Sequence, residues 1–273
     1  MRGLGFAGNL PPVNPPPRFN VLGTGVSALS LDAARDLVLS VRGRKHLGYI
    51  CHATAYGVNA ACRDAAFRTA LNGSWLTHPD GMPLVWLGRW SGHRALTRVY
   101  GPDLMAAVCA AGRPAGLAHY FYGGAPGVAE QLREKLCTRF PGLAVVGTYT
   151  PPFRELLPAE FATLQAAVSA APPDIIWVGL SSPTQEKFMA KHWAALEAGV
   201  LIGVGAAFDF HSGRVAQAPR WMQRSGLEWL FRLGTEPRRL WRRYLVHNPW
   251  FVLRTLAQLT KLKQYDLTTD GSD

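Results

Sequence analysis

Short apolar runs alternate with longer segments of helical periodicity over most of the chain. The apolar runs indicate β-strands at residues 19–22, 46–54, 75–77, 119–122, 144–148, 174–180 and 200–204. The segments between them predict a helix from a cap at Ser30 or Asp32 to about residue 42, and further helices within 58–71, 101–111, 123–136, 158–170 and 181–193. Short buried strands separated by helices predict an α/β fold with a mostly parallel, Rossmann-like sheet.

The loops that follow the strands are the first place to look for a site. Parallel sheets bind their ligands at the carboxyl ends of the strands. The candidate loops are therefore 52–56, 78–81, 123–127, 181–186 and 205–211.

The two ends of the chain differ in pattern from this core. Residues 1–18 are rich in Pro and Gly and predict a flexible arm. We expect the core to span residues 19–217 and a helical C-terminal appendage to span 218–273. Asn248 and Pro249 are typical of a helix start, because proline is favoured at the first helical position. That last helix either lies in a membrane interface or packs on the core.

The excess of positive charge towards the C-terminus predicts a binding partner. The 273 residues carry a net charge of +11, and from residue 214 onward there are 11 Lys and Arg against 5 Asp and Glu. Eight arginines fall between Arg214 and Arg243, and four tryptophans fall between Trp221 and Trp250. Arginine binds phosphate, and tryptophan favours surfaces that are partly apolar and partly hydrated. The appendage is therefore expected to bind an anionic partner.

The cellular compartment is predicted from membrane-targeting patterns and cysteine spacing in the sequence. No apolar run reaches the roughly 18 residues of a membrane-spanning helix, and the first residues do not have the pattern of a signal peptide. The four cysteines show neither CxxC nor zinc spacing and are expected to be buried free thiols. We therefore expect a cytoplasmic protein, for which any contact with a membrane would be peripheral.

Two of the candidate loops carry residues suited to chemistry. Asp80, in the sequence HPDGMPLVW, follows a strand and can act as a general base, although Asp-Gly is also a common turn. The sequence GGAPGV at 123–128 opens a helix, where backbone N–H groups and the helix dipole favour phosphate, but a plain tight turn is an equal alternative.

Other polar residues on these loops are candidates for binding. Gln185 can offer both a donor and an acceptor to a sugar, whereas the adjacent Glu186 suits the positive end of a helix dipole. Asp209 can bind a ribose or base, or cap the next element. Arg98 is a cationic neighbour of the loop at Gly101. The histidines on candidate loops are His52, His78 and His211, and a lone histidine is more often structural. The spacing of acids and histidines implies no metal.

Seven blocks in order carry a resemblance to a known family. They are PDGMPLVW (79–86), RVYGPDLM (98–105), YGGAPGVAE (122–130), FPGLAVVGTYTPPF (140–153), PDIIWVGLSSPTQEKFM (173–189), IGVGAAFDFHSGRVAQAPRWMQRSGLEWLFRL (202–233) and EPRRLWRRYL (236–245). Together, over about residues 21 to 250, they resemble the WecG/TagA/CpsF family of bacterial glycosyltransferases.

The resemblance implies an activity. Family members move a sugar from a nucleotide donor, usually UDP-linked, to an undecaprenyl-diphosphate-linked sugar, with inversion and without a metal or other cofactor. The expected partners are a UDP-sugar donor, a polyprenyl-diphosphate-linked sugar acceptor and the cytoplasmic membrane surface, and not nucleic acid; a homo-oligomer is left open.

The resemblance also implies roles for residues. Asp80 matches the proposed catalytic base. The residues expected to bind substrate are Thr54, Arg98, Gly123, Gly124, Gln185, Asp209, Arg232, Arg239 and Arg242.

The chain departs from the family pattern at two places. The usual Thr-x-Asn after the early strand aligns here with His52 and Thr54, which puts a sugar-holding role for either in doubt. The usual Gly-x-Pro-Lys-Gln-Glu is Ser181-Ser182-Pro183-Thr184-Gln185-Glu186, so the loop differs in flexibility and charge. A different donor sugar is compatible with that change; N-acetylmannosamine, its uronic acid and glucose all remain open.

Three rival functions are weighed against the transferase. A nucleic-acid-binding protein explains the Arg and Trp content but not the loops at 79–81 and 123–128. A nicotinamide-dependent oxidoreductase lacks a GxGxxG after an early strand. A non-catalytic nucleotide-sugar-binding protein of polysaccharide assembly keeps the same binding loops and is the remaining alternative.

Overall fold

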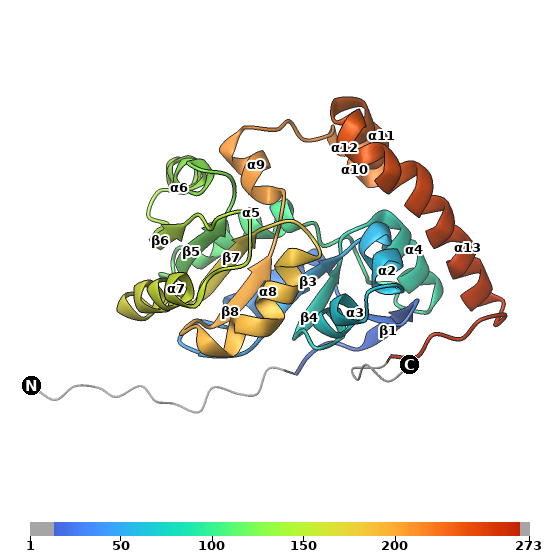
Figure 1. Ribbon diagram of the computed structural model, residues 1–273, viewed down its shortest axis with the longest axis horizontal. Coiled ribbons are helices and arrows are strands. Elements are labelled where there is room, and N and C mark those ends of the chain that lie inside the picture. The colour runs from blue at the N-terminus through green and yellow to red at the C-terminus, as the bar shows by residue number, and fades with distance from the viewer. Residues whose placement is uncertain (1–13, 268–273) are drawn as a thin grey trace, which may run out of the picture.

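The computed structural model describes residues 14–267, and its centre is a parallel sheet (Figure 1). Within these residues six strands pair in the order β4-β3-β8-β7-β5-β6, with every neighbouring pair parallel. The strands are β3 (Tyr49–Ala53), β4 (Leu76–Pro79), β5 (Ala118–Gly123), β6 (Ala144–Tyr149), β7 (Ile175–Gly179) and β8 (Val200–Gly203). The predicted α/β fold with a mostly parallel sheet is confirmed.

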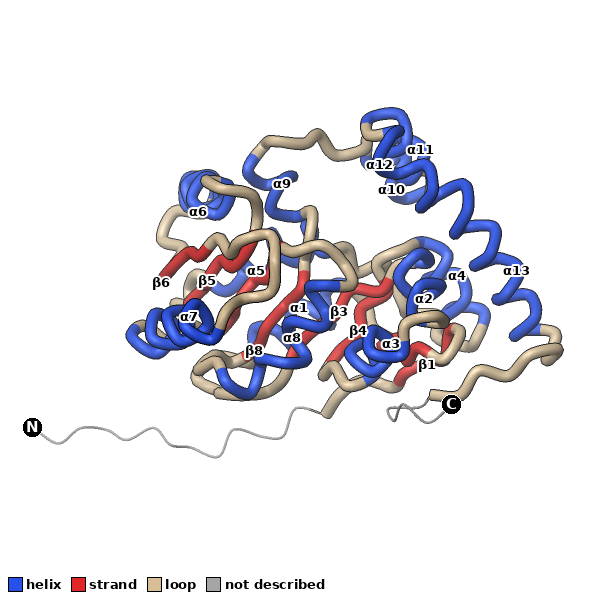
Figure 2. Tube along the Cα trace, viewed as in Figure 1, coloured by secondary structure: helices blue, strands red, loops and turns tan. Residues whose placement is uncertain are grey.

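Helices cover both faces of the sheet, as Figure 2 shows. One face packs against α1 (Leu31–Leu39), α5 (Gly101–Gly112), α6 (Val128–Arg139) and α9 (Ala207–Ser212). The other packs against α2 (Ala55–Ala61), α3 (Ala65–Asn72), α7 (Pro158–Ala170) and α8 (Thr184–His192), the last followed by a 3₁₀ turn at Trp193–Ala195. Burial on both faces explains why the strands consist of nearly continuous apolar residues.

A third apolar cluster lies beside the edge strand β4. An antiparallel hairpin of β1 (Arg18–Val21) and β2 (Thr24–Ser27) packs there with α4 (Met82–Trp90). The Ser27 hydroxyl accepts a 3.0 Å hydrogen bond from the Thr77 N–H of β4. The hairpin thus satisfies part of an edge that would otherwise be open.

The C-terminal helices form a ribbon that returns to this cluster. They are α10 (Arg220–Ser225), α11 (Glu228–Thr235), α12 (Pro237–Trp241), a π-helical turn at Arg242–Val246 and α13 (His247–Leu259). In Figure 1, α10–α12 lie at the top right, and α13 descends from them along the edge of the molecule. Phe251 of α13 is buried in the third cluster, and Arg254 donates to the Asn59 carbonyl and side-chain oxygens of α2. The division at residues 217–218 stays a prediction, as does the arm at 1–18, of which residues 1–13 lie outside the described part.

Some element bounds differ from the sequence prediction because of local capping. The helix expected over 58–71 is two helices, since Asp64 accepts from the Phe67 N–H at 2.9 Å and starts α3 afresh. The segment 205–211, expected as a loop, is mostly α9, which buries Phe208 and ends at the left-handed Gly213.

The ribbon around Pro249 also differs from prediction. We expected a new helix to start at Asn248-Pro249, but the chain is already helical from Pro237. Proline lacks an N–H and crowds the preceding turn, and a widened π turn directly before it accommodates that loss. On α13, Phe251 and Thr255 are buried whereas Val252, Leu253 and Leu256 are more than half exposed. One face of this helix therefore packs on the core, and a membrane role for the other face stays a prediction.

Two further findings bear on the environment of the chain. Between residues 14 and 267, no helix has both the length and the apolarity to cross a membrane. All four cysteines lie in that range and are unbridged, with Cys51 and Cys109 buried and Cys62 and Cys137 half-buried.

Candidate active site

Asp80 lies where the carboxyl end of β4 turns towards α4. Its backbone N–H donates to the Ala53 carbonyl at 2.9 Å, which ties the turn to the end of the neighbouring strand. Only 17% of its side chain is exposed. The carboxylate is therefore held at the edge of the sheet where ligands of parallel sheets bind.

Arg98 fixes this carboxylate from the segment before α5. Its Nε donates to the Asp80 carbonyl oxygen, and its Nη2 lies 3.2 Å from Asp80 Oδ1. Nη1 donates to the Gln223 carbonyl of α10 at 3.5 Å. The N–H groups of the guanidinium thus bond to protein groups, an arrangement that suits orienting Asp80 more than binding a substrate.

The C-terminal ribbon completes this cluster. Glu228 stands at the start of α11. Its Oε2 lies 2.7 Å from Arg98 Nη2, and its Oε1 accepts a hydrogen bond from the Tyr100 hydroxyl at 3.1 Å. The Arg98 guanidinium stacks 4.1 Å over the Tyr100 ring. Two carboxylates therefore share one arginine, and one of the two comes from the C-terminal ribbon.

The electrostatics make Asp80 an unusually weak acid for an aspartic acid. Burial raises the pKa of the Asp80 carboxyl to about 6, with Glu228 raising it and Arg98 and Arg232 lowering it. A carboxylate with a pKa near 6 is ionised at neutral pH and yet more basic than a free aspartate. That combination suits a general base.

Two histidines, the buried His78 and the half-buried His52, lie on the strands beneath this edge. His52 Nδ1 is 2.8 Å from the Gly203 carbonyl, and His78 Nδ1 is 3.3 Å from His52 Nε2. Since a carbonyl only accepts, His52 carries its proton on Nδ1 and accepts from His78. Burial lowers the pKa of His52 to about 4 and that of His78 far below its usual value, so both are neutral.

The glycine turn after β5 makes a tight approach to the neighbouring strand. A Cβ on Gly123 would lie 2.6 Å from the Gly179 carbonyl oxygen of β7, and the Gly124 N–H donates to that same oxygen at 2.9 Å. Gly123, Gly124 and Gly127 all have positive φ. Packing therefore requires glycine at Gly123 and Gly124, whereas at Gly127 only the positive φ favours it. The turn also brings the N-terminus of α6 to the same edge.

Gln185 and Thr54 serve local structure at this edge. Gln185 is buried, its Oε1 accepts from the Gly205 N–H at 2.9 Å, and its Nε2 donates to Glu186 at 3.3 Å. Thr54 caps α2 by accepting from the Gly57 N–H at 3.1 Å. Thr54 lies on the expected loop, whereas Gln185 is in the first turn of α8, and both side chains are already bonded to protein.

The predicted arginines are not all brought to Asp80. Arg232 contributes charge near Asp80 and lies 5.9 Å over the Phe210 ring of α9. Arg242 is exposed and stacks on its neighbour Trp241 at 5.2 Å. The side chain of Arg239 lies outside the described part. Asp209, expected on a loop, is in the first turn of α9.

Arg243 is a residue that sequence reasoning missed. Its guanidinium lies 4.5 Å over the Tyr56 ring of α2, and burial lowers its pKa while Asp80 raises it. Among the described residues its buried Nε has no hydrogen-bond partner. The π turn that contains it is the signal of a special site, but only the structure reveals that turn.

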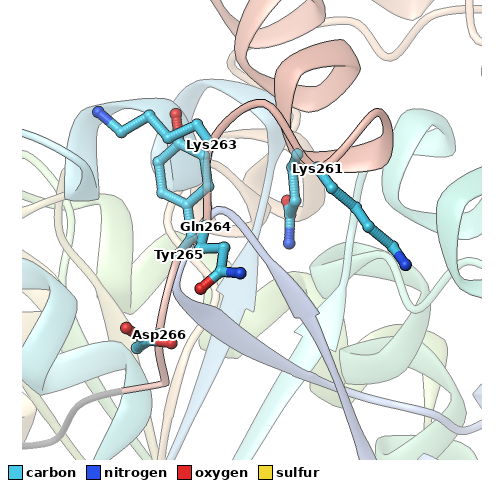
Figure 3. A pocket seen from close by; sticks show the side chains of 6 residues that line it. Lys261, Lys263, Gln264, Tyr265 and Asp266 are labelled. Carbon is cyan, nitrogen blue, oxygen red and sulfur yellow. The ribbon is translucent and has the colours of Figure 1, made fainter.

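A shallow hollow lies at the far end of the C-terminal ribbon (Figure 3). It encloses about 220 Å³ and is lined by Gln258, Lys261, Lys263, Gln264, Tyr265 and Asp266. The 13 residues of α13 separate it from Arg243, a distance of roughly 20 Å at 1.5 Å per residue. It is therefore no part of the Asp80 site.

Comparison with known proteins agrees with the placement of these motifs. Residues 19–265 match the family described as "Glycosyl transferase WecG/TagA/CpsF family". The chain belongs to this family of glycosyltransferases. The match spans the sheet, the Asp80 cluster and the C-terminal ribbon, so the resemblance inferred from the seven blocks is confirmed.

Two curated relatives of this glycosyltransferase have the same name. In Bacillus subtilis (strain 168), an N-acetylglucosaminyldiphosphoundecaprenol N-acetyl-beta-D-mannosaminyltransferase is 31% identical over 207 residues, 76% of this chain and 78% of the relative. In Bacillus spizizenii (strain ATCC 23059 / NRRL B-14472 / W23), a protein of that name is 30% identical over 188 residues, 68% of this chain and 70% of the relative. The chain is thus a glycosyltransferase, as predicted.

Proposed function

We propose that this glycosyltransferase moves a sugar of the N-acetylmannosamine type, or a hexose, from a UDP-sugar to an undecaprenyl-diphosphate-linked sugar. The transfer proceeds with inversion and without a metal, in the synthesis of an exopolysaccharide or another cell-envelope polymer. The names of the two relatives support an undecaprenyl-diphosphate-linked sugar as the acceptor and N-acetylmannosamine as the transferred sugar. The observation that carries the proposal is the buried Asp80 carboxylate at the carboxyl edge of the sheet.

Asp80 acts as the general base in this proposal. An inverting transfer needs one base that takes the proton from the acceptor hydroxyl while the nucleotide leaves from the opposite face of the sugar. A positioned base accelerates such a step by roughly 10²–10⁴-fold. With a pKa of about 6, Asp80 is mostly ionised at pH 7 and can still accept a proton. Glu228, the nearby second carboxylate, is bound to Arg98 and Tyr100.

The leaving nucleotide diphosphate is stabilised by this chain's own cations and amides. The N-terminus of α6, behind the turn at Gly123, offers backbone N–H groups and a positive dipole. Arg232 and Arg243 add positive charge near Asp80. Cations and amides fixed where charge develops can stabilise a diphosphate without a metal ion.

The acceptor lipid implies contact with the inner face of the cytoplasmic membrane. The outer face of α13 exposes Val252, Leu253 and Leu256, each by more than half. An apolar helix face beside basic residues is typical of an interfacial helix. This face therefore supports peripheral binding to the membrane that holds the acceptor.

The test measures transfer from UDP-N-acetylmannosamine to an N-acetylglucosaminyl-diphosphoprenol of short chain, with a panel of other UDP-sugars beside it. Asp80→Asn should lower kcat by at least about 100-fold while the donor binds with unchanged affinity. A chelator should leave the wild-type rate unchanged. Near-normal turnover by Asp80→Asn would refute the base assignment, and a rate abolished by chelation and restored by a divalent ion would refute metal independence.

Vesicle binding tests the membrane face separately. Leu256→Ser should weaken co-sedimentation with vesicles that contain anionic lipid, because it removes an exposed apolar group from α13. Phe153→Ser, at a residue 89% exposed in the segment before α7, is the matched control and should bind like wild type. Equal binding by all three proteins would contradict the assignment of α13 to the membrane.

A further inference from the structure

Glu228 reaches the Asp80 cluster from a distant part of the chain. It opens α11, 148 positions beyond Asp80 in the sequence, and its carboxylate is 13% exposed. Oε2 lies 2.7 Å from Arg98 Nη2, and Oε1 accepts from the Tyr100 hydroxyl at 3.1 Å. Both oxygens thus point into the cluster.

Arg98 is the shared element between the two carboxylates. The same nitrogen, Nη2, lies 2.7 Å from Glu228 and 3.2 Å from Asp80. The shorter contact goes to Glu228. Backbone bonds to the carbonyls of Asp80 and Gln223, with the stacking on Tyr100, keep the guanidinium from following either carboxylate.

We propose that Glu228 is a positioning residue for Asp80: by taking a share of Arg98, it leaves the base only partly neutralised and therefore able to accept a proton. Without Glu228, Nη2 would serve Asp80 alone, and a fully paired carboxylate is a poor base. Since Glu228 belongs to α11, the base acquires its working strength only when the C-terminal ribbon is in place. The inference rests on the proposed function to the extent that Asp80 is the base.

Other charged and titratable groups around Asp80 do not substitute for Glu228. Those that interact with it electrostatically are Arg98 before α5, Tyr100 at the start of α5, Arg232 on α11 and Arg243 in the π turn. His52 and His78 lie on β3 and β4, the strands whose ends meet at Asp80. The arginines favour the ionised carboxylate, and the two histidines are neutral. Glu228 is therefore the group that opposes them.

The test follows the titration of the Asp80 carboxyl by NMR in protein labelled with ¹³C at aspartate, and Asp80→Asn assigns its signal. Glu228→Gln should lower the Asp80 midpoint by about 0.5–1 pH unit, the size expected from removal of a like charge that is partly compensated by Arg98. Glu236→Gln removes the same charge from the residue that follows α11, which is not among the groups that shift the pKa of Asp80 or Arg98, and should leave the midpoint unchanged. An Asp80 midpoint that is unchanged or higher in Glu228→Gln would overturn the proposal.

A second variant separates positioning from a purely structural role. Glu228→Asp keeps the charge and should hold the Asp80 midpoint closer to wild type than Glu228→Gln does. If both variants shift the midpoint equally, Glu228 merely holds α11 in place, and the proposal is wrong.

Kinetics then connect the titration to the reaction. The acid limb of kcat/KM should move to lower pH in Glu228→Gln together with the Asp80 midpoint, and kcat at pH 8 should fall because the base is weaker. A midpoint that shifts while the acid limb stays in place would overturn the link between Glu228 and the base. The titration needs no substrate, so a protein that shows the midpoint shift but transfers no sugar would refute the proposed function and leave the Glu228–Asp80 coupling standing.

Discussion

Replacement of Asp80 by asparagine should make the protein more stable and less active at once. Asparagine has almost the same shape and no charge, so the change removes the buried negative charge and little else. Burial raises the pKa of Asp80 from 3.8 to about 6. A difference of about two pH units corresponds to about 3 kcal/mol, by which ionised Asp80 destabilises the native state at neutral pH.

The sign follows from proton binding. Between pH 3.8 and about 6 the native protein holds the Asp80 proton more tightly than the unfolded chain does, so wild-type stability falls as pH rises through this window. Above about pH 6 the full cost is present, and below 3.8 it is absent. Asp80→Asn has no such cost, so its advantage over wild type should appear across the same window.

Urea unfolding at pH 5, 6.5 and 8 measures this advantage. We expect the free energy of unfolding of Asp80→Asn to exceed that of wild type by up to about 3 kcal/mol at pH 8, and by clearly less at pH 5. Loss of the charged contact to Arg98 reduces the gain but not its dependence on pH. A variant that is less stable than wild type at pH 8, or a difference that does not grow between pH 5 and 8, would refute this account of the site.

Two other substitutions test the surroundings of Asp80, the proposed base. Arg243→Gln should lower kcat by about 10- to 100-fold, the loss expected for one charge-assisted contact to a diphosphate; Arg238→Gln, which is exposed in α12, is the control, and an equal loss in both would refute the inward role of Arg243. Gly123→Ala should destabilise by about 2 kcal/mol or more in urea, since its Cβ would lie 2.6 Å from the Gly179 carbonyl oxygen. Gly127→Ala, where a Cβ would meet nothing within 4 Å among the described residues, should cost only the roughly 1–2 kcal/mol of a left-handed backbone, and a larger loss there than at Gly123 would contradict the packing argument.

Local signals predicted most of the elements of the core. The predicted helix 158–170 has the bounds of α7, because Pro158 stands at its first turn and Glu160 bonds back to the Leu157 N–H at 2.8 Å. The apolar runs located β1 and the six strands of the parallel sheet but not β2 (Thr24–Ser27), and the run at 46–54 is longer than β3 (Tyr49–Ala53). The pattern did not predict the break at Asp64. The apolar period continues across this residue, so its role as a helix cap is seen only in the folded chain.

The candidate site likewise contains residues that the local sequence predicted and residues that only the fold brings together. Asp80 and the turn at Gly123 were predictable, since the carboxyl ends of parallel strands must meet at one edge. Glu228 and Arg243 were not, because their positions depend on how a ribbon more than 140 residues further along packs against that edge. A glutamate at the start of a helix looks like a partner for the helix dipole until Arg98 is seen beside it.

The C-terminal arginines do not act as one set, and this alters the expected membrane energetics. Each basic residue near an anionic surface contributes about 1 kcal/mol, so the charge excess of this segment alone suggests strong electrostatic binding. However, Arg232 and Arg243 contribute charge near Asp80, Arg220 pairs with Asp103 at 2.8 Å, and Arg254 donates to Asn59. Consecutive residues of a helical turn point in different directions, which is why Arg242 remains exposed while the neighbouring Arg243 turns inward. In the proposed binding to a membrane, the exposed apolar side chains of α13 then supply much of the affinity. Vesicle binding should persist in part at 0.5 M salt, where surface charges are screened within roughly 4 Å, and complete release at that salt would contradict this division of the arginines.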